Sequence, residues 1–101
     1  MNKRVILSPD AKVDIRSAVE WYHHIHPHLA SRFEQETLKA LRNIGQFPFR
    51  FRIIKGTVRR AMLKRFPYAV YYSLRDNVAS VAVLHQRRSD AVWMNRGTGR
   101  I

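Results

Sequence analysis

The stretch from Val58 to Arg88 constrains the fold more than any other part of the chain, because its pattern is typical of an antiparallel β-meander. Aromatic and β-branched residues fill it, as they do in strands. Phe66-Pro67 interrupts it, since proline cannot continue a central ladder. Asp76-Asn77 suits a two-residue hairpin turn, because both residue types tolerate positive φ. The pattern therefore predicts three strands: Arg59–Leu63, Tyr68–Leu74 and Val78–Gln86.

The turn at Asp76-Asn77 also predicts the register of the last two strands, because a two-residue turn pairs the residues on either side of it symmetrically. The predicted partners, which share one face, are Tyr68 with His85, Val70 with Val83, and Tyr72 with Val81. Both strands are apolar at nearly every position. We therefore expect both faces of the sheet to be covered, at least in part.

The N-terminal residues predict a strand followed by a helix. Lys3–Leu7 is the expected strand, and Ser8 and Pro9 are typical of an N-cap and a first helical position. Apolar residues then recur at spacings of three and four, which predicts one buried stripe: Ala11, Ile15, Ala18, Tyr22 and Ile25. Pro27 disfavours helix at the residue before it, so we expect this helix to end within residues 24–26.

A second helix is expected from about Leu29 to Ile44, with Gly45 as its C-terminal stop. Its apolar stripe contains Ala30, Phe33, Thr37, Ala40, Leu41 and Ile44. The link between the two helices is short, which predicts an antiparallel helical hairpin. The two stripes can then cover one face of the sheet.

The remaining segments connect or end these elements. Phe47–Thr57 alternates cations with apolar residues, so part of it is expected to form an edge strand. Ser89-Asp90 is expected to cap a short C-terminal helix that runs through Trp93 to about Arg96. Residues 97–101 are expected to be a frayed tail.

This order of elements predicts an α+β fold: an N-terminal strand, a helical hairpin and a three-stranded antiparallel meander with a short C-terminal helix. The 101 residues fit a single domain, residues 1–101, with one core. The chain has no cysteine, which excludes a disulfide framework and a cysteine-based zinc site. Its apolar runs are too short for a signal peptide or for a bilayer span of about 20 residues, so we expect a cytoplasmic protein without membrane contacts. The predicted core contains Ile15, Tyr22, Phe33, Leu41, Val70, Tyr72, Val81 and Val83.

The distribution of charge is uneven along the chain. Residues 1–36 contain five Lys or Arg and five Asp or Glu, so their charges cancel. Residues 37–101 contain fourteen Lys or Arg against Asp76 and Asp90, and they carry the whole net charge of +12. Such a field favours a polyanion, either nucleic acid or an acidic protein segment. The alternative, that these cations only keep a small domain soluble, does not explain the separation of signs.

Four histidines crowd the link between the helices, and a fifth ends the last predicted strand. The four are His23, His24, His26 and His28. No carboxylate or thiolate joins them at ligand spacing, so we predict a solvated helix end and no metal site or cofactor. His85 follows the last core strand beside Arg87 and Arg88, and neighbouring cations favour its neutral form. It suits either a general base or a structural histidine at the strand end.

Two arginine pairs are the main candidates for contacts with an anion. Neighbouring side chains of a strand point to opposite faces, so Arg59-Arg60 and Arg87-Arg88 each place one guanidinium on each face. One member of a pair can therefore reach an exposed anion while the other bonds backbone or an acid. Lys64 and Arg65 lie in the same region of the sequence.

Catalysis of RNA cleavage has a weaker basis in this sequence. The reaction needs a base for the 2′-hydroxyl, cations for the phosphate and an acid for the leaving oxygen. No Glu follows residue 36, and the last Tyr is Tyr72. His85 is the one conventional base in the basic half.

Together these motifs resemble the RelE/ParE superfamily of type II toxins. The resemblance rests on Arg59-Arg60, Arg65-Phe66-Pro67-Tyr68, Tyr71-Tyr72, the His85-x-Arg87-Arg88 block and Trp93, behind a helical hairpin that carries Trp21-Tyr22 and Ala30-x-x-Phe33. It covers about residues 3–96. It implies a bacterial toxin that a cognate acidic antitoxin neutralises in a hetero-oligomer, through the margin of the hairpin and the basic sheet.

The superfamily divides by target, and the resemblance leaves two hypotheses about the target, beside a third reading in which the chain is an inert remnant that only binds antitoxin. The HxRR block and Trp93 are closer to the ParE branch, which poisons DNA gyrase and is not a nuclease. The alternative is a RelE-like endonuclease that cuts mRNA on the ribosome, although nothing here matches that branch's late Tyr, its Glu or its terminal His. The predicted target-binding residues are Arg59, Arg60, Lys64, Arg65, His85, Arg87, Arg88 and Trp93. Under the nuclease hypothesis the catalytic set is Arg59, Arg60, Lys64, His85, Arg87 and Arg88.

Overall fold

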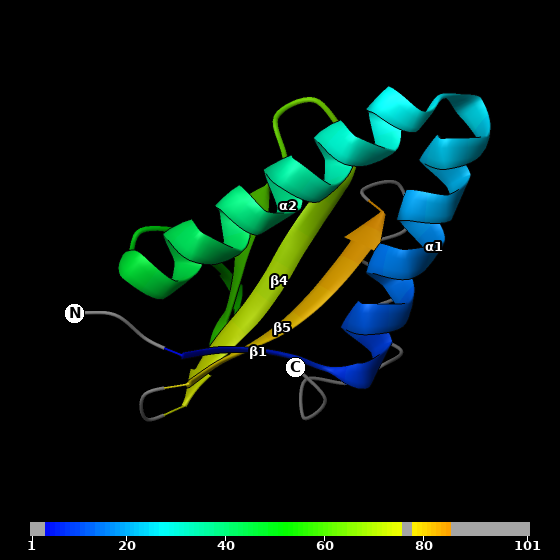
Figure 1. Ribbon diagram of the computed structural model, residues 1–101. Helices are drawn as coiled ribbons and strands as arrows, with labels where there is room; N and C mark the ends of the chain where they lie inside the picture. Colours follow the sequence, from blue (N-terminus) through cyan, green and yellow to red (C-terminus); the bar gives the residue numbers. More distant parts are fainter. Residues whose placement is uncertain (1–3, 76–77, 86–101) are drawn as a thin grey trace.

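The structure is a computed structural model, and it describes residues 4–75 and 78–85, with the backbone alone for residues 78 and 80–85. Seven elements follow one another along this part of the chain (Figure 1): β1 (Arg4–Leu7), α1 (Pro9–Ile25), α2 (Pro27–Gln46), β2 (Arg52–Lys55), β3 (Val58–Met62), β4 (Tyr68–Arg75) and β5 (Val78–His85). This is the α+β order that the sequence predicts. The expected C-terminal helix and the tail at 97–101 lie outside the described residues.

The strands form one five-stranded sheet in the order β1-β5-β4-β3-β2. The meander β3, β4 and β5 is antiparallel, and β1 adds to β5 in parallel. All three predicted pairs of the last hairpin are confirmed: Tyr68 with His85, Val70 with Val83, and Tyr72 with Val81. Arg75 pairs with Val78, so the described register is the one that a two-residue connection predicts.

The start of α1 agrees with the sequence in atomic detail. The Ser8 hydroxyl accepts a hydrogen bond from the backbone N–H of Ala11 at 3.0 Å, and Pro9 lies in the first turn. The helix ends at Ile25, inside the expected range, and the His26 N–H donates to the Tyr22 carbonyl at 2.8 Å. His26 then caps the next helix, because its Nδ1 accepts from the His28 N–H at 3.1 Å.

The second helix is longer than expected, and the prediction that Gly45 stops it is wrong. The helix α2 begins at Pro27 and runs to Gln46, so that Gly45 lies buried within it. The physical reason is the position of Pro48, which disfavours helix at Phe47, the C-cap. Neither described helix is both long and apolar enough to cross a membrane.

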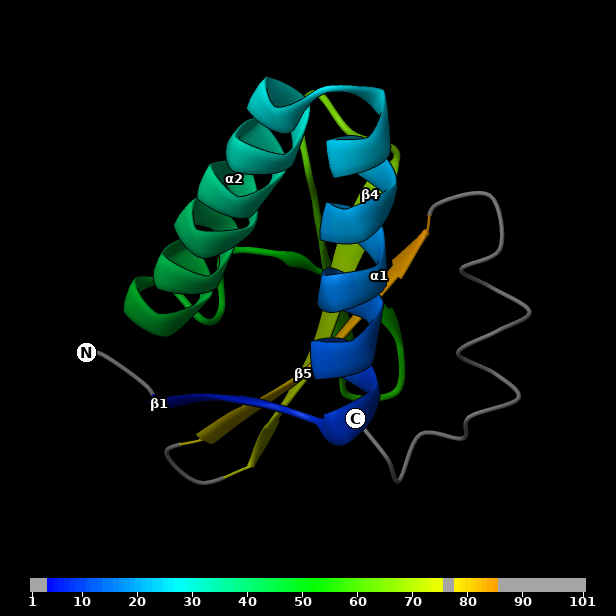
Figure 2. The same cartoon turned by 45° about the vertical axis from the view of Figure 1, so that its right-hand side comes forward.

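Both helices pack on one face of the sheet (Figure 2). Their contact is an aromatic cluster in which Tyr22 and Phe33 lie 5.4 Å apart between ring centroids, and Phe66 stands edge-on to both. Phe33 is fully buried, whereas Ile25 is 56% exposed, so the last position of the predicted α1 stripe is wrong. Ile25 is the final residue of α1, where the chain turns away into α2.

The predicted core is confirmed for the six of its side chains that the structure describes. Phe33, Val70 and Tyr72 are fully buried, and Ile15, Tyr22 and Leu41 are half-buried against them. The side chains of Val81 and Val83 lie outside the description. On the opposite face of the sheet, Val58, Ala69 and Tyr71 form a second buried cluster, which agrees with the expectation that both faces are covered.

The segment between α2 and the meander contains the expected edge strand. β2 pairs with β3 in antiparallel fashion, with a bulge between Ile53 and Lys55. Gly56 follows with φ of 55°, a left-handed conformation that suits glycine. The two edges of the sheet are therefore β1 on one side and β2 on the other.

Candidate functional site

The pair Arg59-Arg60 lies in β3, and the strand separates the two guanidiniums as the sequence predicts. Arg59 pairs with Tyr72, on the face that the helices cover, whereas Arg60 pairs with Tyr71 on the opposite face. The Arg59 Nη1 donates to the carbonyl oxygen of Phe51 at 2.7 Å and to that of Phe49 at 3.2 Å. Arg59 therefore ties the segment before β2 to the sheet.

Arg60 occupies a different electrostatic environment. Its register partner on the other side is Arg52 of β2, so two guanidiniums lie directly across from each other. Like charges at opposed positions of an antiparallel pair destabilise it. No Asp or Glu occurs between residues 37 and 75, whereas ten Lys or Arg do. This face of the edge therefore favours an anion.

Lys64 and Arg65 are exposed on the loop between β3 and β4, and three contacts hold the backbone of this loop. The Leu63 N–H donates to the Tyr68 carbonyl at 3.0 Å, which closes the loop. Phe66 is buried among the aromatic rings. The Glu36 Oε1 accepts from the backbone N–H groups of Lys64 and Arg65 at 3.2 and 3.3 Å. Two cations are thus presented on a fixed loop.

The sheet register shows which predicted residues lie near this loop. His85 is the last residue of β5 and pairs with Tyr68, the first residue of β4, so the end of β5 lies beside the loop. Arg59 and Arg60 lie about four residues further along β3, roughly 13 Å away at 3.3 Å per residue. Arg87, Arg88 and Trp93 lie outside the described residues. Lys64, Arg65 and the backbone of His85 are therefore brought together, and the arginine pair of β3 is a separate group.

Tyr72 is the most perturbed titratable group that the structure describes. Its hydroxyl donates to the Pro48 carbonyl at 2.6 Å, and its side chain is fully buried. Burial raises the pKa of Tyr72 to about 12, against a smaller lowering effect of the Arg59 guanidinium. Burial also raises the pKa of Tyr22, and Tyr68 adds to the effect. Both tyrosines therefore stay protonated near neutral pH, which suits hydrogen-bond donors and not general bases.

The histidines of the helix link form a cap and a stack. The rings of His26 and His28 lie nearly parallel with centroids 5.3 Å apart. Among the described residues, no three His, Cys, Asp or Glu side chains are close enough together to hold a metal ion.

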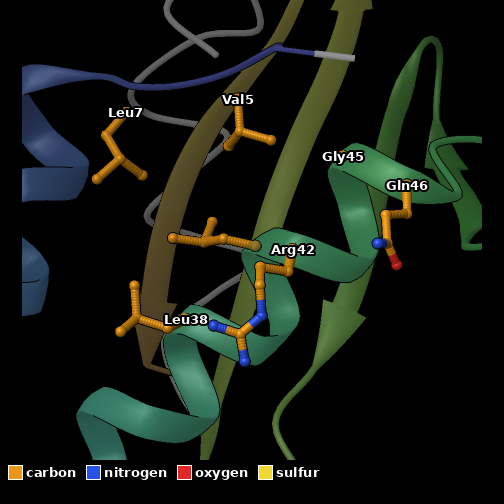
Figure 3. Close-up of a pocket in the computed structure, with 7 residues that line it drawn as sticks. Val5, Leu7, Leu38, Arg42, Gly45 and Gln46 are labelled. Carbon is orange, nitrogen blue, oxygen red and sulfur yellow. The ribbon is translucent and has the colours of Figure 1, made fainter. Parts of the chain in front are cut away.

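A groove that the sequence did not predict lies between β1 and α2 (Figure 3). Its volume is about 450 Å³, and its lining consists of Val5, Leu7, Leu38, Leu41, Arg42, Gly45 and Gln46. Apolar side chains of β1 and α2 face one another across it, and the Arg42 side chain extends over α2 at its margin. The one sequence signal was Leu38, which lies off the buried stripe of α2 and is 54% exposed. Such an apolar groove with a guanidinium beside it can accept an apolar side chain next to a carboxylate.

Comparisons with known proteins agree on one kind of protein. A family model described as the ParE toxin of type II toxin-antitoxin system, parDE, matches residues 5–90. A chain from the chromosomal ParDE toxin-antitoxin system of P. aeruginosa has a similar structure, with a TM-score of 0.72 over 82% of this chain and 95% of that chain. The two sequences are 14% identical, so this likeness concerns the fold. No curated protein matches the sequence significantly.

Proposed function

Because this chain belongs to the ParE family, and is therefore the toxin of a type II toxin-antitoxin system, we propose that it inhibits growth by binding and poisoning DNA gyrase. The observation that carries the proposal is the match of the ParE family model to residues 5–90. An antitoxin partner follows from the family itself. The target, its binding surface and the position of the antitoxin are parts of the proposal.

The polar groups of the described sheet support binding in preference to acid–base catalysis. Tyr72 is committed to the Pro48 carbonyl and has a pKa of about 12. Arg59 is committed to two backbone carbonyls, and Glu36 to two backbone N–H groups. Each of these groups stabilises a loop, which leaves His85 as the candidate base of the alternative endonuclease.

The proposed gyrase-binding surface lies at the end of the sheet where β5 finishes. Lys64 and Arg65 are exposed there on a fixed loop, next to the backbone of His85. The other predicted target-binding residues, Arg87, Arg88 and Trp93, follow β5 in the chain and lie outside the described residues. Cations on a loop whose backbone is held favour an acidic or phosphate-bearing partner, since the loop backbone loses little conformational freedom on binding.

A supercoiling assay with purified gyrase tests this function. The toxin is expected to inhibit supercoiling and to increase DNA cleavage complexes, and Lys64→Gln/Arg65→Gln is expected to weaken both effects at least tenfold. Arg75→Gln is the matched control, because Arg75 is an exposed cation at the end of β4 opposite to the loop. Gyrase activity that stays normal at toxin concentrations well above those of the enzyme would refute the proposal.

Transcripts from cells that express the toxin test the alternative. If the chain poisons gyrase, primer extension is expected to find intact mRNA while DNA damage accumulates. Codon-phased cleavage that His85→Gln abolishes would instead establish the endonuclease, because loss of a general base costs about 10²–10⁴-fold in rate.

For the antitoxin we propose the groove between β1 and α2 as an anchoring site. The groove offers apolar walls for an aliphatic or aromatic side chain, and Arg42 offers a guanidinium for an acidic neighbour. The net charge of +12 favours an acidic partner. Leu38→Glu is expected to weaken the complex with the cognate antitoxin at least tenfold, because it places a carboxylate in an apolar contact. Trp21→Ala, which removes an exposed side chain of α1 instead, is the control. Unchanged affinity of Leu38→Glu would exclude the groove.

A further inference from the structure

Two phenylalanine rings are exposed on the segment between α2 and β2, and each has a guanidinium over its face. Phe47 is 50% exposed and Phe49 is 67% exposed. The Arg50 guanidinium carbon lies 5.5 Å from the Phe47 ring centroid, and that of Arg59 lies 5.4 Å from the Phe49 centroid. We call these four residues the cation–aromatic surface. Exposed aromatic rings beside cations can stack on planar groups of a partner while the cations contact its charge.

The segment that carries these rings is anchored to the sheet. The Tyr72 hydroxyl donates to the Pro48 carbonyl at 2.6 Å, and Pro48 itself is buried. Arg59 donates to the carbonyls of Phe49 and Phe51, on either side of the turn. These donors hold backbone oxygens at three positions. Hydrogen bonds from the sheet therefore hold the backbone that carries the two rings.

The neighbouring edge of the sheet favours an anion and disfavours an added peptide strand. β2 is an edge strand with a bulge between Ile53 and Lys55. It carries Arg52 directly across from Arg60, on the sheet face opposite to Arg59. Bulges and cations on an edge strand oppose pairing with another strand. The part of the chain between residues 37 and 75 contains no acidic residue. A polyanion with planar groups satisfies both the charge and the exposed rings.

We propose that the cation–aromatic surface binds single-stranded DNA. Bases stack on the exposed rings of Phe47 and Phe49, and phosphates contact Arg50. Stacking of a base on an aromatic side chain contributes about 1–3 kcal/mol, and every base has a suitable face. The choice of DNA over RNA rests on the proposed function, because gyrase acts on DNA. The stacking contacts are argued from the exposed rings alone and do not rest on that function. The surface is distinct from the Lys64-Arg65 loop.

Fluorescence anisotropy with a labelled oligo(dT) of 15 nucleotides and the full chain tests the proposal. Phe47→Ala/Phe49→Ala is expected to weaken binding of the single strand at least tenfold, while binding of a duplex with the same number of phosphates changes less than twofold. Both side chains are exposed, so circular dichroism is expected to show an unchanged fold. Trp21→Ala removes an exposed aromatic residue from α1 and is expected to bind oligo(dT) normally.

A second variant separates charge from stacking. Arg50→Gln is expected to reduce the slope of log K against log salt by about 0.7, the value for one phosphate contact on a single strand. The proposal is refuted if the double phenylalanine variant binds oligo(dT) normally, or if it loses single-strand and duplex binding equally. It is also refuted if oligo(rU) binds at least tenfold more tightly than oligo(dT), or if polyglutamate of equal charge competes equally well.

The same variants in the supercoiling assay distinguish this inference from the proposed function. Gyrase inhibition without any binding of oligo(dT) would refute the single-strand site alone. Binding of oligo(dT) that depends on the phenylalanines, without any effect on gyrase, would support the site and refute gyrase as the target.

Discussion

Tyr72→Phe tests the contact that holds the segment before β2 against the core. The variant removes one hydroxyl from a fully buried side chain and leaves the Pro48 carbonyl without the donor that lies 2.6 Å away. An unsatisfied buried acceptor costs about 1–3 kcal/mol. In a domain of this size, each kcal/mol lowers Tm by about 4–8 °C. We therefore expect a fall in Tm of at least about 4 °C near neutral pH.

The same variant is expected to change the response to alkaline pH. Burial raises the pKa of Tyr72 to about 12 in the folded protein, against its ordinary value of 10.0. A group whose pKa is raised by folding contributes stability that is complete below its unfolded pKa and is lost as the pH rises through its folded pKa. Two pKa units correspond to about 2.7 kcal/mol, lost between about pH 10 and pH 12. Tyr72→Phe lacks this titration, so its stability deficit is expected to shrink as the pH rises.

Urea denaturation at about pH 7 and at steps up to about pH 11 measures both effects. Tyr22→Phe is the control, because burial also raises the pKa of Tyr22 but its side chain is only half-buried. It is expected to cost less than Tyr72→Phe at pH 7. Two results together would refute the reasoning. The free energy of unfolding of Tyr72→Phe would lie within about 0.5 kcal/mol of that of the unmodified protein at pH 7, and the variant would lose as much stability at alkaline pH as the unmodified protein does.

Three further substitutions test the packing and the loops. Phe33→Ala is expected to lower the free energy of unfolding by about 3–5 kcal/mol in urea, since it empties the centre of the aromatic cluster; a loss below 1 kcal/mol would contradict this. Glu36→Ala removes the acceptor of two loop N–H groups, so trypsin is expected to cut faster at Lys64 and Arg65, and an unchanged cleavage rate would count against it. Gly56→Ala is expected to cost about 1–2 kcal/mol because φ is 55°, although a Cβ there meets no atom within 4 Å; equal stability would show that the turn can relax.

Local chemistry explains what the sequence predicted well. The Ser8 cap, the end of α1 before Pro27 and the register around residues 76–77 each depend on a few neighbouring residues with narrow backbone preferences. The start of α2 was predicted two residues late because its local signal is an unusual one. The N-cap is His26, whose Nδ1 accepts the hydrogen bond that a Ser, Thr, Asp or Asn side chain usually accepts at this position.

Features that depend on segments far apart in the chain were harder to predict. The division of Arg59 and Arg60 between faces follows from strand geometry, but the partners of Arg59 are carbonyls eight and ten residues earlier, in a turn. The groove needs β1 to lie beside α2, and that arrangement depends on β1 crossing to pair with β5. Nothing in the local sequence of Leu38 specifies this neighbour. A sequence pattern can therefore identify the cations of the candidate site more readily than the surfaces that lie between elements.

The sheet order also constrains how an antitoxin bound in the groove could block the other surfaces. The groove lies between β1, at one edge of the sheet, and α2, and its lining includes Gln46. Phe47, the first residue of the cation–aromatic surface, follows Gln46 directly, so the two surfaces meet at the end of α2, one Cα–Cα step of about 3.8 Å apart. β2, at the other edge of the sheet, is four strand spacings of about 4.8 Å from β1, or roughly 19 Å. An extended chain covers about 3.3 Å per residue, so a segment that leaves the groove needs about one or two residues to reach Phe47 but about six to reach β2. An antitoxin anchored in the groove is therefore expected to cover the Phe47 ring first, and only a longer acidic segment beyond the anchor would also neutralise the β2 edge.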